Sequence, residues 1–174
     1  TGGQIWGSPA VADIDLDGLD DVIFVSKSKN IFVFDANGLK WNYETDSQLI
    51  GTPSIGNVND SDELEIVISG YSNSENNLFI FSHEGSILNE IEISDKNKSG
   101  FALADFNDNG FDDIVFGTDD NKLYLLLDNN IVATGFPFES NAKFNLAPII
   151  VSFLNQNIII APCKNKTVYA INQN

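Results

Sequence analysis

The chain has little of what several common protein classes need. Cys163 is its one cysteine and His83 its one histidine. A single cysteine cannot form an internal disulfide, and one histidine cannot build a zinc-type His/Cys cluster. The sequence also lacks a run of about 18 apolar residues, the length that a membrane-spanning helix requires. We therefore expect no disulfide scaffold, no membrane insertion and no enzymatic site.

Positive charge is scarce as well. The 174 residues include 9 basic and 25 acidic side chains, which gives a formal net charge of −16. Such a chain is a poor partner for nucleic acid or anionic membranes. Its hydrophobic content of 43% indicates a globular protein, and its length suits one domain, 1–174, with a buried core. The chain begins at Thr1 without an initiator Met or a signal peptide, so we expect a processed or excised piece of a protein.

The stretch 12–21 contains what the chain has in abundance, closely spaced acids. It reads as a calcium loop with oxygen ligands at positions 1, 3, 5, 7 and 9: Asp13, Asp15, Asp17, Leu19 (through its backbone carbonyl) and Asp21. Gly18, at position 6, supplies a sharp turn. An EF-hand loop would end on a bidentate Glu at position 12, but Phe24 stands there within an apolar, strand-like block. The loop is therefore predicted to join two strands.

The loop pattern repeats along the chain. The segments 57–67 and 105–115 align with 13–23, and Pro9, Pro53, Phe101 and Pro148 stand at intervals of 44, 48 and 47 residues. A period near 45 with only strand signals inside is typical of propeller blades, which contain four strands each.

We therefore predict an all-β protein of about four antiparallel, four-stranded β-propeller blades. The expected blades are 8–45, 52–94, 99–138 and 146–174. The expected strands are 9–13, 21–26, 30–35 and 39–44; 52–57, 65–70, 77–82 and 86–93; 100–105, 112–118, 122–127 and 131–136; and 146–152, 157–161 and 167–171.

The last blade is expected to be incomplete, because the chain ends before a fourth strand. Only about three residues at 4–6 are available to fill that gap. An unpaired edge strand is an aggregation hazard. We therefore favour an arc of a larger propeller, completed by further protein or by another copy of the chain. A small closed four-bladed propeller is the alternative.

At this point the sequence resembles a known family. The segments 8–21, 100–105 and 112–117 are similar to the FG-GAP (VCBS-type) repeat of integrin α-subunit propellers and of many bacterial surface or secreted proteins. The resemblance implies calcium in the loop between the first two strands of a blade. It gives the third blade the ligands Asp105, Asn107, Asn109, Phe111 (carbonyl) and Asp113, and the second blade a weaker set, Asn57, Asn59, Ser61, Glu63 (carbonyl) and Glu65.

The candidate loops are not equivalent. The third has two amides in place of carboxylates, so we expect it to bind calcium more weakly than the first. The second has Asp62 where the glycine should be, and the fourth blade has no acid at 152–157 and is expected to bind nothing. The alternative to calcium binding is that these Asp-Gly and Asn-Gly pairs are ordinary turn residues between strands. Where calcium binds, we expect it to hold the turn and to take no part in catalysis.

The resemblance implies a calcium-binding interaction or adhesion module of a secreted or cell-surface protein, presenting a propeller face to a protein or glycan ligand. The alternative is a carbohydrate-binding domain appended to a secreted enzyme. The residues Trp6, Trp41, Tyr43, Phe136 and Phe138 could stack on sugar rings, but we expect such aromatics to pack blade against blade.

Overall fold

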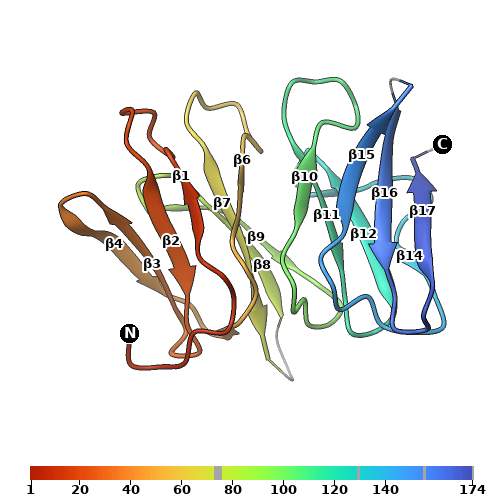
Figure 1. The fold of residues 1–174 in the computed structure, drawn as a ribbon, viewed down its shortest axis with the longest axis horizontal. Helices are drawn as coiled ribbons and strands as arrows, with labels where there is room; N and C mark the ends of the chain where they lie inside the picture. Colours follow the sequence, from red (N-terminus) through yellow and green to blue (C-terminus); the bar gives the residue numbers. More distant parts are fainter. Residues whose placement is uncertain (73–75, 129, 155, 174) are drawn as a thin grey trace.

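The computed structural model describes residues 1–72, 76–128, 130–154 and 156–173, and its strands form four antiparallel sheets that stand side by side in chain order (Figure 1). Sheet 1 contains β1 (Ala10–Ala12), β2 (Asp21–Val25), β3 (Asn30–Asp35) and β4 (Gly38–Glu44). Sheet 2 contains β5 (Gln48–Leu49), β6 (Ser54–Gly56), β7 (Glu65–Tyr71), β8 (Asn77–Phe81) and β9 (Ile87–Glu92). Sheet 3 contains β10 (Ala102–Ala104), β11 (Asp113–Gly117), β12 (Lys122–Leu127), β13 (Ile131–Val132) and β14 (Phe138–Glu139). Sheet 4 contains β15 (Ile149–Phe153), β16 (Gln156–Pro162) and β17 (Val168–Asn172).

The predicted all-β organisation is confirmed, and sheet 4 has the three strands expected of it. Two sheet edges differ from the prediction. The inner edge of sheet 2 is made by β6 together with β5, which pairs with the end of β7. The outer strand predicted at 131–136 is split into β13 and β14, which pair with opposite ends of β12. A turn interrupts the strand, because the N–H of Phe136 donates to the carbonyl of Ala133 at 3.0 Å, and Pro137 after it has no N–H to donate to a ladder. Within the described residues no helix is long and apolar enough to cross a membrane.

The sheets are held together by apolar packing of face against face. Side chains alternate across a strand, so the two middle sheets bury residues on both faces. In β7, Ile66 and Ile68 belong to the core shared with sheet 1, whereas Val67 belongs to the core shared with sheet 3. A third core joins sheets 3 and 4 around Val115 and Ile159. Each core is thus a layer between two neighbouring sheets.

The four sheets form an open arc. Cores join sheet 1 to sheet 2, sheet 2 to sheet 3 and sheet 3 to sheet 4, and among the described residues none joins sheet 4 back to sheet 1. Figure 1 shows these two sheets at opposite ends of the molecule. The N-terminal segment stays with sheet 1, because the backbone N–H of Lys27 donates to the carbonyl of Gln4 at 2.9 Å. The Lys27 ammonium lies 4.2 Å from the centre of the Trp6 ring. The chain alone therefore does not close into a four-bladed ring.

Four of the five aromatic residues singled out from the sequence pack between sheets, as predicted: Trp41, Tyr43, Phe136 and Phe138. The rings of Trp41 and Tyr43 lie 6.0 and 5.2 Å from that of Phe81 in sheet 2. The indole N–H of Trp41 also donates to the carbonyl of His83 at 2.7 Å. Trp6 is different, since 60% of its surface is exposed.

Replacing Phe81 by Ala is expected to lower the free energy of unfolding by about 3–5 kcal/mol, because it removes a fully buried ring from the core between sheets 1 and 2. Urea denaturation followed by circular dichroism measures this change. The control is Leu88→Ala in β9, whose side chain is 47% exposed and which should change the stability by less than about 0.5 kcal/mol. Equal effects of the two variants would contradict the central place of this core.

Candidate metal loops at one end of the sheets

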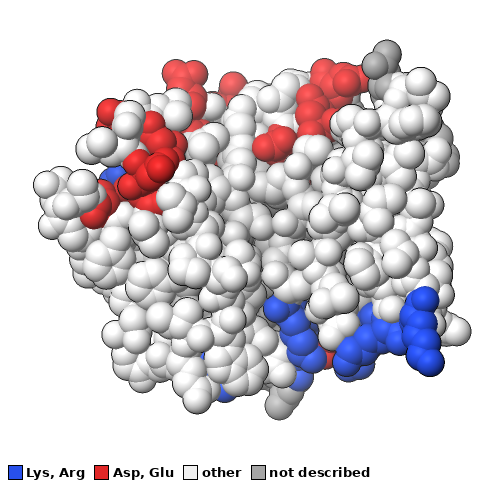
Figure 2. Space-filling model, in the orientation of Figure 1, with Lys and Arg blue, Asp and Glu red and all other residues white. Residues whose placement is uncertain are grey.

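The three predicted metal loops lie at the same end of the molecule. They connect β1 to β2, β6 to β7 and β10 to β11, at the upper end of the view in Figure 1. Figure 2 shows Asp and Glu side chains gathered along this end and Lys side chains along the opposite end. The packing of the sheets therefore concentrates negative charge on one rim.

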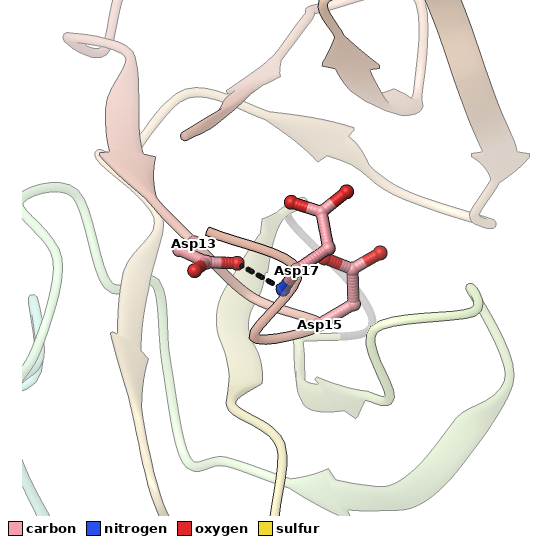
Figure 3. A group of neighbouring side chains, drawn as sticks. All are labelled: Asp13, Asp15 and Asp17. Carbon is pink, nitrogen blue, oxygen red and sulfur yellow. Dashed lines mark hydrogen bonds between the residues drawn. The ribbon is translucent and has the colours of Figure 1, made fainter. Parts of the chain in front are cut away.

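The first loop brings three of its predicted ligands together. Asp13, Asp15 and Asp17 each offer a carboxylate oxygen, and these atoms lie within 4.8 Å of one another (Figure 3). The two carboxylate oxygens of Asp13 accept the backbone N–H groups of Asp17 at 3.0 Å and Gly18 at 2.8 Å. Gly18 has a φ of 91°, in the left-handed region that favours glycine. The turn therefore keeps its shape through bonds to its own first acid.

The fourth side chain of this set, Asp21, is engaged by a lysine. The Lys40 ammonium lies 2.6 Å from Oδ2 of Asp15 and 3.2 Å from Oδ1 of Asp21. The hydrogen bond from Lys40 is the main reason why the pKa of Asp15 lies below its usual value. Burial alone would lower the pKa of Lys40, but its bonds to the two acids raise it. A protein cation thus already neutralises part of the first loop.

Sequence reasoning missed Lys40 because it was placed only as part of an outer strand. The structure shows a bulge in the β3–β4 ladder, where Val33 pairs with Trp41 and Phe34 with Leu39. Lys40 is the extra residue of that bulge, and its side chain reaches the first loop. The strand order could have indicated this contact, because the β3–β4 turn and the β1–β2 loop lie at the same end of an antiparallel sheet.

The third loop has the same hydrogen bonds with different side chains. Asp105 accepts the backbone N–H groups of Asn109 at 3.2 Å and Gly110 at 2.7 Å. Asp113 accepts the N–H of Phe106 at 2.8 Å, as Asp21 does that of Ile14 at 3.4 Å. The φ of Gly110 is 93°, close to that of Gly18. The repeat therefore specifies one turn conformation in both places.

A neighbouring acid modifies the third loop. Asn107 and Asn109 donate through their side-chain amides to Oδ1 of Asp128, at 3.2 and 2.6 Å. The backbone N–H of Asp128 donates to Asp113 at 3.0 Å, and burial raises the pKa of Asp113. Asp128 lies in the turn after β12, the third strand of its sheet, whereas Lys40 lies within β4, and no pattern in the sequence assigned Asp128 to the third loop.

These neighbours alter the comparison of the two loops. The four candidate ligand carboxylates of the first loop and the Lys40 ammonium that contacts two of them sum to a formal charge of −3. The ligand carboxylates Asp105 and Asp113 of the third loop sum, together with Asp128, to −3 as well. The weaker calcium binding expected of the third loop stays a prediction, and these neighbouring charges bear on it as well as the ligand charges.

The second loop also assembles its predicted groups. The hydroxyl of Ser61 lies 2.6 Å from Oε1 of Glu65 and 3.0 Å from the carbonyl of Glu63. Burial raises the pKa of Glu65. The side-chain carbonyl oxygens of Asn57 and Asn59 are buried and have no hydrogen-bond partner. The amide oxygens of Asn57 and Asn59 therefore accept no hydrogen bond, although they belong to the same loop as the Ser61 hydroxyl, the Glu63 carbonyl and the Glu65 carboxylate.

Unpaired oxygens test whether these residues fit a cation. In the part of the chain that the structure describes, five buried side-chain atoms have no hydrogen-bond partner: Asp15 Oδ1, Asn57 Oδ1, Asn59 Oδ1, Ser99 Oγ and Asp119 Oδ1. Three of the five stand at predicted ligand positions. A buried polar atom without a partner costs about 1–3 kcal/mol, and a hard cation such as calcium takes oxygen ligands. The first two loops therefore fit a calcium ion.

The loops are also bonded to one another in a row. The backbone N–H of Leu64 in the second loop donates to the carbonyl of Ile14 in the first at 3.0 Å. The equivalent N–H of Asp112 in the third loop donates to the carbonyl of Asn57 at 2.6 Å. The side chain of Asn157 in sheet 4 donates to the carbonyl of Asp105 at 2.6 Å. A change in one loop therefore acts directly on its neighbour.

A polar pocket of about 530 Å³ lies between the third loop and sheet 4. Its lining consists of Asp105, Phe106, Asp108, Ser152, Gln156, Asn157, Asn172 and Gln173. In sheet 4 the pairing of β15 with β16 continues to Phe153 and Gln156, so this sheet has no counterpart of the long candidate loops of the other sheets. Asn155, between these two strands, lies outside the described residues.

No family model matches the chain, and no curated protein matches it. Solved structures do. BBS1N in complex with ARL6DN is similar with a TM-score of 0.71 and 9% identity, over 98% of this chain and 52% of that one. BamB from Moraxella catarrhalis gives 0.66 and 15%, over 95% and 48%. The chain thus spans about half the length of these two proteins. The likeness concerns the fold alone, and that fold is the β-propeller.

Replacing Lys40 by Met is expected to raise the calcium affinity of the first loop at least about threefold, because an ammonium beside Asp15 opposes a second cation. Isothermal titration calorimetry measures the affinity. The matched control is Lys164→Met, which removes the same charge from an exposed position at the opposite end. Equal or weaker binding by Lys40→Met would show that Lys40 does not compete with the metal.

Proposed function

We propose that this chain is a calcium-stabilised β-propeller module that binds a protein partner, as part of a secreted or cell-surface protein. The observation that supports calcium is the set of unpaired buried oxygens at Asp15, Asn57 and Asn59. The resemblance of the loops to FG-GAP repeats points in the same direction and favours an extracellular setting, where calcium is abundant. The propeller fold supports an interaction role.

In this proposal calcium acts as a clip on each turn. Several carboxylates held within a few ångströms repel one another, and the acids of the first loop have only Lys40 to offset this. A calcium ion would take the side-chain oxygens together with the carbonyl of Leu19 or Glu63. Because the loops are bonded in a row, holding one turn also supports the next. The hydrogen bonds within each turn hold the candidate ligand side chains in place for the ion.

The partner is proposed to meet the acidic loop end of the arc. Negative side chains gather there (Figure 2), and such a surface attracts and orients partners of opposite charge. The similar propeller BBS1N is known in complex with a protein, ARL6DN, which supports a protein partner for this fold. We propose binding and no catalysis, because the acids of the loops serve as turn acceptors and candidate metal ligands.

Calcium is expected to raise the melting temperature, and a chelator should reverse the effect. At a calcium concentration of ten times the dissociation constant, each occupied loop adds about 1.4 kcal/mol. Asp13→Asn should reduce the calcium-dependent shift, because it removes a candidate ligand. The matched control is Asp20→Asn, which removes the same charge from the same loop at a position that is not a ligand. Melting that does not change across a calcium titration would contradict the proposal.

A second candidate function, carbohydrate binding, is favoured by the polar pocket beside the third loop. Side-chain amides from Gln156, Asn157, Asn172 and Gln173 line it, and amides both donate to and accept from sugar hydroxyls. Phe106 adds one apolar ring. Asp105 and Asp108 also line the pocket, and their carboxylates accept from sugar hydroxyls but oppose an anionic ligand, so a neutral saccharide suits this lining better than an anionic one.

A glycan array tests this candidate, and at least one neutral glycan should bind. Asn172→Ala should weaken that binding about tenfold, because it removes a donor and an acceptor from the pocket. Asn42→Ala, an exposed amide in sheet 1, is the control that should leave binding unchanged. An array without hits would rule out the carbohydrate function and leave the calcium proposal standing.

A further inference from the structure

Sheet 4 leaves an apolar face open at one end of the arc. Its three strands contain no charged residue. Ile150 and Ile159, which pair with each other, belong to or pack against the core shared with sheet 3. The alternate residues Ile149, Val151 and Ile160 therefore point away from that core. Ile149 is 59% exposed and Val151 43%.

Sheet 1 leaves a second apolar face at the other end. Ile23 and Val33 belong to the core shared with sheet 2, so their neighbours Val22, Phe24 and Phe34 point outward. The ring of Phe24 stacks on that of Phe34 at 5.7 Å and also on that of Phe32. These rings form a half-buried aromatic cluster, and in the part of the chain that the structure describes no other sheet packs on it.

The interior joints of the arc show what covers a face of this kind. Val22 occupies the same register position as Ile66, Ile114 and Ile159 in the other sheets, because each pairs with the second residue after the repeat position of Pro9, Pro53, Phe101 or Pro148. Ile66, Ile114 and Ile159 are each 0% exposed, and each packs in the core shared with the preceding sheet. Val22 is 38% exposed, and among the described residues no core joins this face of sheet 1 to another sheet. The open face of sheet 1 is therefore the face that receives a preceding sheet.

The open face of sheet 4 is the complementary one. Ile160 occupies the register position of Ile23, Val67 and Val115, and each of those residues is 0% exposed and packs toward the following sheet. We propose that the open face of sheet 4 packs on the open face of sheet 1 of a second copy, and that two copies close into a ring of eight sheets. The joint repeats the geometry of the three joints inside the chain.

The loop end supplies a second observation. Leu64 and Asp112 donate their backbone N–H groups to the loop of the preceding sheet. The equivalent residue of the first loop is Asp20, and its N–H has no partner among the described residues. In the ring, the β15–β16 turn of the other copy occupies the place of a preceding loop.

The proposed size agrees with the propellers that the chain resembles. The chain matches about half of BBS1N and of BamB, so two copies together have the extent of one comparable ring. The joint is heterologous, because it brings together two different faces. It is formed twice in the ring, and such contacts end growth when the ring closes. The proposal does not depend on occupied metal loops.

Light scattering coupled to size-exclusion chromatography tests the assembly through its mass. One chain weighs 19.1 kDa, and we expect twice that mass for the native chain. Val22→Lys and Val151→Lys should each give monomers, because a lysine in either open face is buried without a partner in the joint. The matched control is Leu88→Lys, similarly exposed but on a middle sheet, which should remain a dimer. Circular dichroism of every variant shows whether it is folded.

Mixing the two variants tests the geometry of the joint. In a mixture of Val22→Lys and Val151→Lys, one joint carries both lysines and the other carries none, so a dimer held by one intact joint should reappear. Three results would overturn the proposal: a native chain that stays monomeric at all concentrations, open-ended polymers, or variants that remain dimeric. A dimer lost in only one variant would also overturn it, since it would mean that like faces pair. None of these masses bears on calcium-dependent melting, so the two proposals can fail separately.

Discussion

The structure depends on the packing of one sheet face against the next. Strand residues alternate in direction, so each sheet has two sides, and burying apolar surface stabilises by about 25 cal/mol per Å². In β7 this alternation sends Ile66 and Ile68 to one core and Val67 to the next. Sheets of this kind are stable only in series. The series also aligns them, which is why the loops that follow the first strand of sheets 1, 2 and 3 lie together on one rim (Figure 1).

The alignment has an electrostatic cost, and the three loops offset it in different ways. In the first, the Lys40 ammonium lies between Asp15 and Asp21. In the third, two carboxylates are replaced by amides, and these donate to Asp128. In the second, the Ser61 hydroxyl donates to Glu65, while the amide oxygens nearby have no donor. The backbone of the turn is therefore conserved among the repeats more closely than its charge. A bound cation would therefore stabilise most the loops whose buried oxygens have no hydrogen-bond partner, which are the first and the second.

Much of this arrangement could be predicted from the sequence. The strand periodicity and the spacing of Pro9, Pro53 and Pro148 placed the sheets, and the positions of Asp13 and Asp105 placed the turns. The features that could not be predicted depend on the exact register and pairing of the strands. Lys40 reaches the first loop only because a bulge adds one residue to β4, and a bulge leaves no clear mark in composition. Asp128 required knowing which turns share an end of the molecule. β5 pairs with β7 through two residues, too few to show an alternating pattern.

The sequence favoured an arc over a closed ring, because only residues 4–6 could fill the open edge of the last sheet, but the angle between the sheets lay beyond it. The structure shows an arc, and its two ends are unlike each other in charge as well as in shape. The rim at sheet 1 carries the five acids of the first loop, whereas the segment 152–157 of sheet 4 contains no acid. Two acidic loops meeting at a joint would repel each other. A joint between sheet 4 and sheet 1 places an uncharged segment beside the loop with the most acids. The absence of acids from the last repeat therefore reduces the electrostatic repulsion at the proposed joint between sheet 4 of one copy and sheet 1 of the other.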